Sequence, residues 1–470
     1  MSATTASSVT TVTASVRSIL RSRRWSRLGA IALVAAFLGT SLWLLRWSGG
    51  NSRATPDTFW YARDSFRYAG YSARSADAMA ARLTCQSYKR ARPNFDNAGC
   101  LRYRNRLPRS APIRFQRIFT SRPGYALSTV PFVWVFGRAG FAIGSAALGV
   151  ACGVAIVMLA LAAGLRLTQA LLAETLFYLL PTGLWASRML AEAPMLLCLI
   201  ASLIGAVLLL SGRVRVPARG RVRVRARTIP AASLLAAGLT CLCAVKPANG
   251  VALAAVLAVM AVACLPFARG ARRTYLLIAA VSIGVLAGNL LVSAALRLPS
   301  VDETLQDAFT HHFRRPDVGD PWNRLGDRDH GLLDGKITPQ LLNHPFIAAM
   351  YVFAAIGLFR WLRPGAAGLV SLAGLTGVMV ISMHPVTTET ARLTVVTWIP
   401  VALGLAALIG PRLPRRTDPP RAPSGSDDAA GLDEAVAPSP VLARSRAPAG
   451  ASTVPADIRS SRAERQDLDR

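Results

Sequence analysis

Asp57 is the residue near the start of the chain whose type and position first suggest chemistry. It lies in the polar, arginine-rich stretch Gly49–Arg122, which separates two apolar segments. Aromatic residues at 59–61 follow it, and such residues gather at the membrane–water interface. A carboxylate at that surface can act as a general base toward an acceptor hydroxyl. The alternative is that Asp57 only caps a helix beginning at Thr58, and Asp64 is a second, weaker candidate base.

Three cations are candidates for binding a phosphate group. Arg117 and Arg122 lie at the end of the same polar stretch, and the planar guanidinium of arginine donates two hydrogen bonds to a phosphate. Lys246 is one of only three lysines in the chain, and it precedes a proline between two apolar runs. An ionisable residue at the edge of the bilayer is a functional candidate by default. The alternatives are that the arginines only fix topology and that Lys246 extends its amine to the interface.

Glu192, His384 and Arg392 complete the set of candidate substrate-binding residues. Glu192 opens an apolar run and is closely followed by a proline, which is also favourable chemistry for a helix start. His384 and Arg392 precede the last apolar run, and Arg392 has an alternative role as the ion-pair partner of Glu389. All three are expected on the same membrane face as Asp57, where residues that only anchor topology would not gather.

The composition places these residues in a membrane protein. The chain has 470 residues, 52% of them hydrophobic, and its mean hydropathy is +0.37. Its apolar runs have the length of about 20 residues that a helix needs to cross the hydrocarbon core. We therefore expect an all-α polytopic membrane protein with about ten transmembrane helices and a long first outer loop. The expected spans lie near 28–45, 138–162, 167–186, 192–211, 231–245, 248–267, 275–296, 345–362, 366–383 and 393–410.

The expected spans divide the chain into a membrane core and two tails. Residues 1–27 are predicted to be a basic cytoplasmic tail, 28–410 the transmembrane core, and 411–470 a disordered cytoplasmic tail rich in Pro, Ala, Ser and Arg. Two long outer loops, 47–123 and 298–344, interrupt the core. The short loops on one side carry most of the arginines, which the positive-inside rule assigns to the cytoplasm. We therefore expect a multi-pass protein of the cell membrane with both termini cytoplasmic.

The net charge of +30 comes almost entirely from arginine. In a soluble protein such a charge would suggest nucleic acid, but here it is spread over loops and tails that flank membrane segments. Basic residues in these places hold topology and meet anionic lipid head groups. We therefore expect membrane lipids as partners and no nucleic acid.

Two of the seven cysteines are candidates for a disulfide. Cys85 and Cys100 lie in the first polar loop, where an oxidising outer face would allow them to pair. The other five lie in apolar runs, and the Cys241-x-Cys243 pair has no second pair with which to bind zinc. His311 and His312 are adjacent and do not easily face one metal ion. We therefore expect no metal site from these side chains.

Several short motifs resemble those of the GT-C superfamily of integral-membrane glycosyltransferases, in the group of protein mannosyltransferases and aminoarabinose transferases. The resemblance covers roughly 28–410 by layout. It rests on an early acidic residue in the first outer loop, a proline step into the second span, an outward Glu-x-Pro start of a later span, and a Glu-x-x-Arg entry to the last. In this chain these are Asp57; Arg122-Pro123-Gly124-Tyr125 with Pro131-Phe132 and Phe136-Gly137; Glu192-Ala193-Pro194; and Glu389-Thr390-Ala391-Arg392 with Pro400.

The resemblance implies inverting transfer of a hexosyl or pentosyl group from a polyprenyl-phosphate carrier to an acceptor on the extracytoplasmic face. Asp57 would be the base, and Arg122 and Lys246, with Arg117, would stabilise the departing lipid phosphate. The family often has two acidic residues together in this loop, whereas Thr58 follows Asp57 here, so a divalent metal remains a possible cofactor rather than a required one. Two alternatives stay open: a transporter or flippase, and a non-catalytic protein that binds lipid or a partner.

Overall fold

The computed structural model describes residues 6–47, 53–211, 221–383 and 390–410. Within these ranges every regular element is a helix, and no strand forms. The chain divides into the units Met1–Arg412 and Leu413–Arg470. The predicted C-terminal tail, 411–470, therefore lies outside the described residues.

Eight helical stretches in the described part of the chain are long and apolar enough to cross a membrane. They are Ser26–Trp47, Pro123–Ala162, Glu192–Ser211, Thr228–Val245, Pro247–Cys264, Arg272–Ala295, Pro364–Ser382 and Thr390–Ile409. Two shorter apolar helices, Leu167–Leu179 and Pro345–Trp361, fall on the other two predicted spans. The chain is therefore an all-α protein of the polytopic membrane class, as its apolar runs predict.

The first helix, α1 (Ala6–Trp47), begins well before the predicted span and runs through most of the predicted tail 1–27. At its other end Arg46 holds the end of α8 (Leu167–Leu179). Arg46 Nε donates to the carbonyl of Tyr178 at 2.6 Å, and its Nη2 donates to the carbonyl of Leu179. The last carbonyls of a helix lack partners within it, so this side chain satisfies them and fastens α1 to α8.

Prolines set helix boundaries at two places in the membrane core, one inside a predicted span and one between two predicted spans. The segment 167–186 is not one helix, because Leu180 is extended and separates α8 from α9 (Pro181–Ala186). The segment 231–267 is two helices, α11 (Arg221–Val245) and α12 (Pro247–Cys264). Proline disfavours the helical conformation in the residue before it, which is why Leu180 and Lys246 both leave the helix.

The apolar segment that follows the first outer loop forms the helix α6 (Pro123–Phe136). Gly137 follows it with a φ of 56°, and after η1 (Gly137–Ala139) the chain turns back as α7 (Gly140–Ala162). A Cβ added at Gly140 would lie 2.2 Å from the carbonyl oxygen of Phe132, so the close return of the chain requires a glycine there. α6 packs on both α7 and α2.

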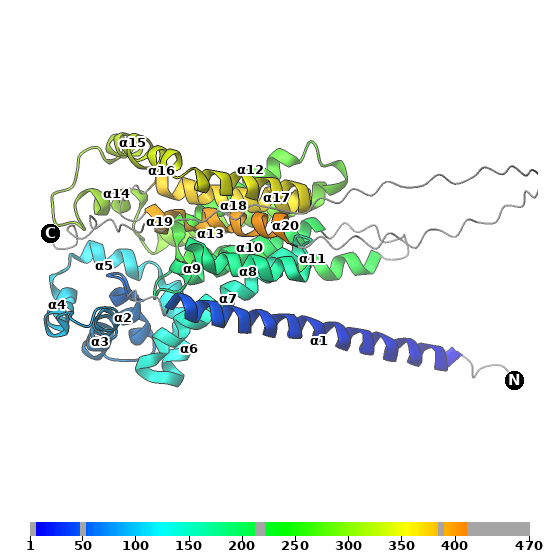
Figure 1. Ribbon diagram of the computed structural model, residues 1–470, viewed down its shortest axis with the longest axis horizontal. Coiled ribbons are helices and arrows are strands. Elements are labelled where there is room, and N and C mark those ends of the chain that lie inside the picture. The colour runs from blue at the N-terminus through cyan, green and yellow to red at the C-terminus, as the bar shows by residue number, and fades with distance from the viewer. Residues whose placement is uncertain (1–5, 48–52, 212–220, 384–389, 411–470) are drawn as a thin grey trace, which may run out of the picture. The chain divides into compact units, whose positions relative to one another are not determined.

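The two predicted outer loops are largely helical and lie at the same end of the bundle (Figure 1). One cation links them: Arg114 lies 2.9 Å from an oxygen of Asp317 and 3.7 Å from one of Glu303. The first loop forms α2 (Thr58–Tyr68), α3 (Ala73–Ala91), α4 (Asn97–Ser110) and α5 (Ile113–Thr120). The second forms α14 (Val301–Phe309), α15 (Pro321–Leu332), η4 (Leu333–Ile337) and α16 (Thr338–Asn343).

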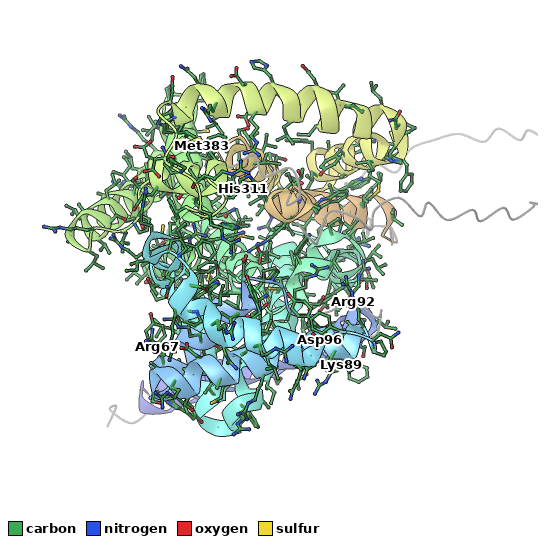
Figure 2. The ribbon with its side chains drawn as sticks, turned by 90° about the vertical axis from the view of Figure 1, so that its left-hand side faces the viewer. Arg67, Lys89, Arg92, Asp96, His311 and Met383 are labelled. Carbon is green, nitrogen blue, oxygen red and sulfur yellow. A yellow bond between two sulfur atoms is a disulfide. The ribbon has the colours of Figure 1, made fainter. Side chains whose placement is uncertain are left out.

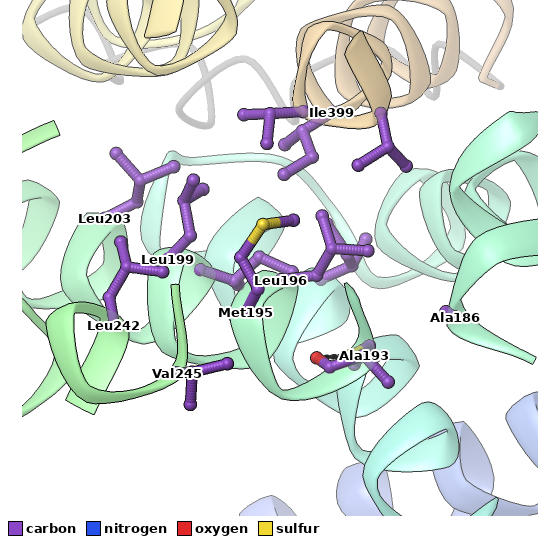
Figure 3. Close-up of a cluster of buried hydrophobic side chains, with 14 of the residues drawn as sticks. Ala186, Ala193, Met195, Leu196, Leu199, Leu203, Leu242, Val245 and Ile399 are labelled. Carbon is purple, nitrogen blue, oxygen red and sulfur yellow. Dashed lines mark hydrogen bonds between the residues drawn. The ribbon is translucent and has the colours of Figure 1, made fainter. Parts of the chain in front are cut away.

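The apolar core of the bundle is centred on α10 (Glu192–Ser211), which packs against α7 and α11. Figure 3 shows Leu196, Leu199 and Leu203 of α10 between α11 and the last helix, α20 (Trp398–Ile409). The remaining described helices are η3 (Arg269–Ala271), α13 (Arg272–Ala295), α17 (Pro345–Trp361), α18 (Pro364–Ser382), α19 (Thr390–Leu393) and η6 (Thr394–Thr397).

A disulfide joins Cys85 of α3 to Cys100 of α4. It closes a loop of 15 residues and holds these two amphipathic helices together above the membrane bundle.

We expect the Cys85→Ser/Cys100→Ser variant to lose about 3 kcal/mol of stability, the loop-closure value for a ring of this size. Thermal unfolding of the detergent-solubilised protein, with and without reductant, measures the change. Reductant should lower the melting temperature of the wild type and leave that of the variant unchanged. Alkylation mass spectrometry that finds both thiols free in the native protein would contradict the bridge.

Candidate functional site

Four charged side chains from distant parts of the chain form one connected network. Arg392 Nη1 donates to Asp57 Oδ2 at 2.7 Å, and Arg392 Nε donates to Glu192 Oε1 at 2.5 Å. Lys246 Nζ donates to the same Glu192 oxygen at 2.9 Å. Two carboxylates and two cations are thus joined in the order Asp57–Arg392–Glu192–Lys246, which we call the charge network.

Each member of the charge network stands where a helix begins or is interrupted. Asp57 directly precedes α2, and Glu192 opens α10. Lys246 lies between α11 and α12 with φ −147° and ψ 86°, a conformation that Pro247 favours. Arg392 is in the short helix α19. Helix ends that meet at one end of the bundle can present long side chains to one another without disturbing the apolar contacts below.

The charge network is almost completely removed from solvent. Glu192 has no exposed surface, and Arg392 and Lys246 expose 7% and 8% of theirs. Asp57 is the exception, because 26% of its side chain is exposed. A buried charge is very costly unless it is paired and hydrogen-bonded. The three buried members therefore depend on one another, while the Asp57 carboxylate remains open to a molecule arriving from outside.

Apolar packing fixes the backbone on which the charge network stands. Figure 3 shows Ala193, Met195 and Val245 in the buried cluster. Ala193 follows Glu192 in the chain, and Val245 precedes Lys246. Gly124, near the start of α6, packs so closely against the end of α11 that an added Cβ would lie 2.8 Å from the backbone nitrogen of Val245. Small residues here allow the helix ends to approach, so that the charged side chains meet.

Two further cations that the sequence alone does not single out lie beside the charge network. Arg104 of α4 donates to the carbonyl of Pro56 at 3.3 Å, and its guanidinium lies 5.9 Å from the ring of Phe59. Arg188 is half-buried, stacks 4.5 Å from the ring of Trp185, and interacts electrostatically with both Arg392 and Glu192. In a sequence with 54 basic residues, two more arginines carry no distinguishing signal.

Two aromatic side chains with titratable groups interact electrostatically with Asp57. Burial raises the pKa of Tyr88, and this is opposed by Arg104, which donates a hydrogen bond to it. The pKa of His312 is raised chiefly by its hydrogen bond to Asp307, with a smaller contribution from the Asp57 carboxylate. His312 also contacts the ring of Phe115, with centroids 4.6 Å apart. Both predicted outer loops thus border the exposed carboxylate.

The remaining predicted site residues fall in three different places. Arg122 caps the start of α6 and lies near enough to Lys246 for their positive charges to repel. Arg117 is exposed and donates to the carbonyl of Arg297 at 2.6 Å, so the structure does not bring it into the charge network. His384 and Glu389 lie outside the described residues. Asp64 is on α2 but belongs to a separate cluster with Arg63 and Arg67.

The carboxylates of the charge network do not have the composition of a metal site. Both Asp57 and Glu192 already have guanidinium or ammonium partners, and a divalent cation would have to displace them. Among the described residues no group of three or more His, Cys, Asp and Glu side chains is placed to hold a metal ion.

Comparison with known proteins gives no relative of this chain: no protein family, no curated protein and no solved structure matches it.

Glu192→Gln should destabilise the protein strongly, because it leaves Lys246 and Arg392 buried without their shared anion. We expect a loss of about 3–5 kcal/mol, the usual cost of breaking a buried ion pair. The matched control is Glu303→Gln, which removes the 3.7 Å contact with Arg114 at a partly exposed site and should cost less than about 1 kcal/mol. Thermal unfolding in detergent compares the two, and equal effects would contradict a buried network.

The buried carboxyl group of Asp64 should make the free energy of unfolding depend on pH. Burial raises its pKa from 3.8 to about 6, although Arg63 and Arg67 oppose the change. The folded chain therefore binds this proton more tightly than the unfolded chain. The stabilisation is complete below about pH 4 and is lost as the pH rises to about 6. A shift of this size corresponds to roughly 3 kcal/mol.

Asp64→Asn should remove that loss. Between pH 4 and 7 we expect the unfolding free energy of the wild type to fall by about 2–3 kcal/mol relative to that of the variant. Melting curves recorded across this range test the expectation. Parallel pH profiles for the two proteins would show that Asp64 does not titrate in this window.

Proposed function

We propose that the chain is an inverting membrane glycosyltransferase of the GT-C type. The donor is a sugar carried on a polyprenyl phosphate, and the acceptor is a hydroxyl group on the extracytoplasmic face. The observation that carries the proposal is the charge network: a partly exposed carboxylate, Asp57, is held by a buried arginine at helix ends that border both predicted outer loops.

The proposed reaction is a direct displacement at the anomeric carbon. As the acceptor oxygen attacks, Asp57 takes the hydroxyl proton. The bond between the anomeric carbon and the phosphate oxygen breaks, and the polyprenyl phosphate leaves with the bonding electrons. Because attack and departure occur on opposite faces, the anomeric configuration inverts. Negative charge thus moves from the carboxylate side to the leaving phosphate, where cations lower the barrier.

Arg392 supports this role of Asp57 in two ways. Its guanidinium donates to Asp57 Oδ2 at 2.7 Å, which fixes the position of the carboxylate. Its second contact, with Glu192, fixes the guanidinium in place, so that Asp57 is oriented by a side chain that is itself held. Glu192 and Lys246 are then positioning residues that act through Arg392.

Arg122 is the best candidate for the cation at the leaving phosphate. It lies at the start of α6, near the Lys246 end of the charge network. Among the described residues no carboxylate forms an ion pair with it, whereas Lys246 is already committed to Glu192. An arginine without an anionic partner can give both hydrogen bonds of its planar fork to a phosphate.

Asp57→Asn should abolish transfer while leaving insertion in the membrane intact. Loss of a general base costs about 10²- to 10⁴-fold in rate, and the amide keeps the shape of the side chain. Glycan profiles of cells that carry only the variant should match those of cells lacking the protein. The matched control is Asp64→Asn on the same helix, which should keep the wild-type profile. An Asp57→Asn profile identical to that of the wild type would refute the assigned base.

Glu174 supports a second candidate function, transport or lipid flipping coupled to a proton. It is fully buried in α8, and both carboxylate oxygens lack a hydrogen-bond partner within the part of the chain that the structure describes. Gly39 and Gly153 make room for it, since a Cβ added at either would lie 2.8 or 2.4 Å from its Oε1. An ionisable residue inside membrane helices is a mark of ion and proton pathways.

The two candidate functions differ in which carboxylate they require. A glycosyltransferase is expected to lose activity with Asp57→Asn and to keep it with Glu174→Gln. A proton-coupled transporter is expected to show the reverse. When the flipped lipid is the sugar carrier, the glycan profiles of the same cells distinguish the two functions.

A further inference from the structure

A second charged feature lies outside the charge network. A cavity of about 530 Å³ opens between the end of α1, the outward face of α3 and the start of α7. No member of the charge network lines it. Its polar lining is dominated by four arginines, Arg53, Arg82, Arg90 and Arg138.

The four arginines come from three separate parts of the fold. Arg82 and Arg90 lie on α3, Arg138 lies in η1, and Arg53 lies in the segment between α1 and α2. No acidic residue lines the cavity. Within the described ranges none of the four forms an ion pair. Like charges gathered in one concave space repel one another, so an anion placed among them is favoured.

Arg53 is the arginine held most firmly. Its guanidinium lies 4.4 Å from the ring of Trp43 and 4.5 Å from that of Trp47, and its Nε donates to the carbonyl of Ser187 at 3.3 Å. Its Nη2 is buried and has no hydrogen-bond partner among the described residues. A buried donor without a partner is unfavourable, and an acceptor oxygen on a ligand would satisfy it.

The other lining residues indicate what kind of anion the cavity accepts. Trp47, Met79, Leu83, Ala142 and Met189 give it an apolar side, next to the last turn of the apolar helix α1. Arginines that only anchor topology spread their charge into water, whereas here three exposed arginines face one space with an apolar wall. A phosphate attached to a hydrocarbon chain matches both halves of this lining.

We propose that this cavity binds the phosphate group of an anionic amphiphile, at a site separate from the charge network. The planar guanidinium groups hold the phosphate oxygens, and the apolar wall contacts the first part of the hydrocarbon. The same arginines would also accept free phosphate, so the two sources are separated by experiment. The site does not depend on the proposed transfer reaction, because binding is measured without any donor sugar or acceptor.

Arg82→Gln/Arg90→Gln in the full-length protein tests the site. Both positions are exposed on α3, so the change removes two charges without opening the core. The matched control is Arg102→Gln/Arg106→Gln on α4, which removes the same charge from two exposed arginines that do not line the cavity. Arg138→Gln provides an independent variant on a different element. Figure 2 shows the end of the molecule that carries α3 and α4, with Lys89, Arg92 and Asp96 labelled.

The probes are dihexanoyl phosphatidic acid, dihexanoyl phosphatidylcholine and inorganic phosphate, added to the detergent-solubilised protein and measured by microscale thermophoresis. We expect phosphatidic acid to bind more tightly than the other two. Its Kd should rise about tenfold or more in Arg82→Gln/Arg90→Gln, rise less in Arg138→Gln, and stay unchanged in the control. Tenfold corresponds to about 1.4 kcal/mol.

Each other outcome has a definite meaning. Equal weakening in the α3 and α4 variants shows attraction to overall charge and overturns the proposal. Binding of phosphatidylcholine as tight as that of phosphatidic acid also overturns it. The arginines would then not distinguish an anionic head group from a zwitterionic one. A third outcome is that inorganic phosphate binds as tightly as phosphatidic acid and shows the same rise in Kd in Arg82→Gln/Arg90→Gln. That result would overturn the proposal that the ligand is an amphiphile and would show a site for free phosphate.

Discussion

One carboxylate oxygen, Glu192 Oε1, accepts hydrogen bonds from both Arg392 and Lys246, and the end of the bundle is built around it. Glu192 is fully buried, and Arg392 and Lys246 are nearly so. Without the Glu192 carboxylate, both cations would be buried with no shared anion, which is costly. The two hydrogen bonds to Glu192 therefore join the start of α10 to α19 and to the break between α11 and α12. The exposed Asp57 is the only member that can change its partner without disturbing the core.

The helices were largely predictable, because their signals are local. An apolar run of about 20 residues predicts a membrane helix wherever it lies in the chain. The breaks at Leu180 and Lys246 have an equally local cause, since each precedes a proline. The segment 167–186 nevertheless resembles one span in sequence, because only Pro181 marks the break within a continuously apolar stretch. The helical conformation of α6 and its return onto α7 through Gly137 also required the structure.

The candidate site was predictable as a set of residues and not as a set of contacts. Charged residues at the edges of apolar runs marked Asp57, Glu192, Lys246 and Arg392 one by one. Their pairing joins positions 54, 200 and 335 residues apart, and nothing in the local sequence specifies which distant helix ends meet. The residues Arg104 and Arg188 could not be distinguished from the many other arginines. Arg117 had the right charge and the right loop, yet it binds a backbone carbonyl instead.

The order of the charge network along the chain has a consequence for how the protein is made. Synthesis proceeds from the N-terminus, so Glu192 and Lys246 emerge and enter the membrane well before Arg392. Until the final helix is inserted, Asp57 has no guanidinium partner and the buried pair lacks one of its cations. The charge network is thus completed by Arg392, the member that lies furthest along the chain. A chain released before Arg392 is made would lack the guanidinium that joins the first outer loop to the start of α10.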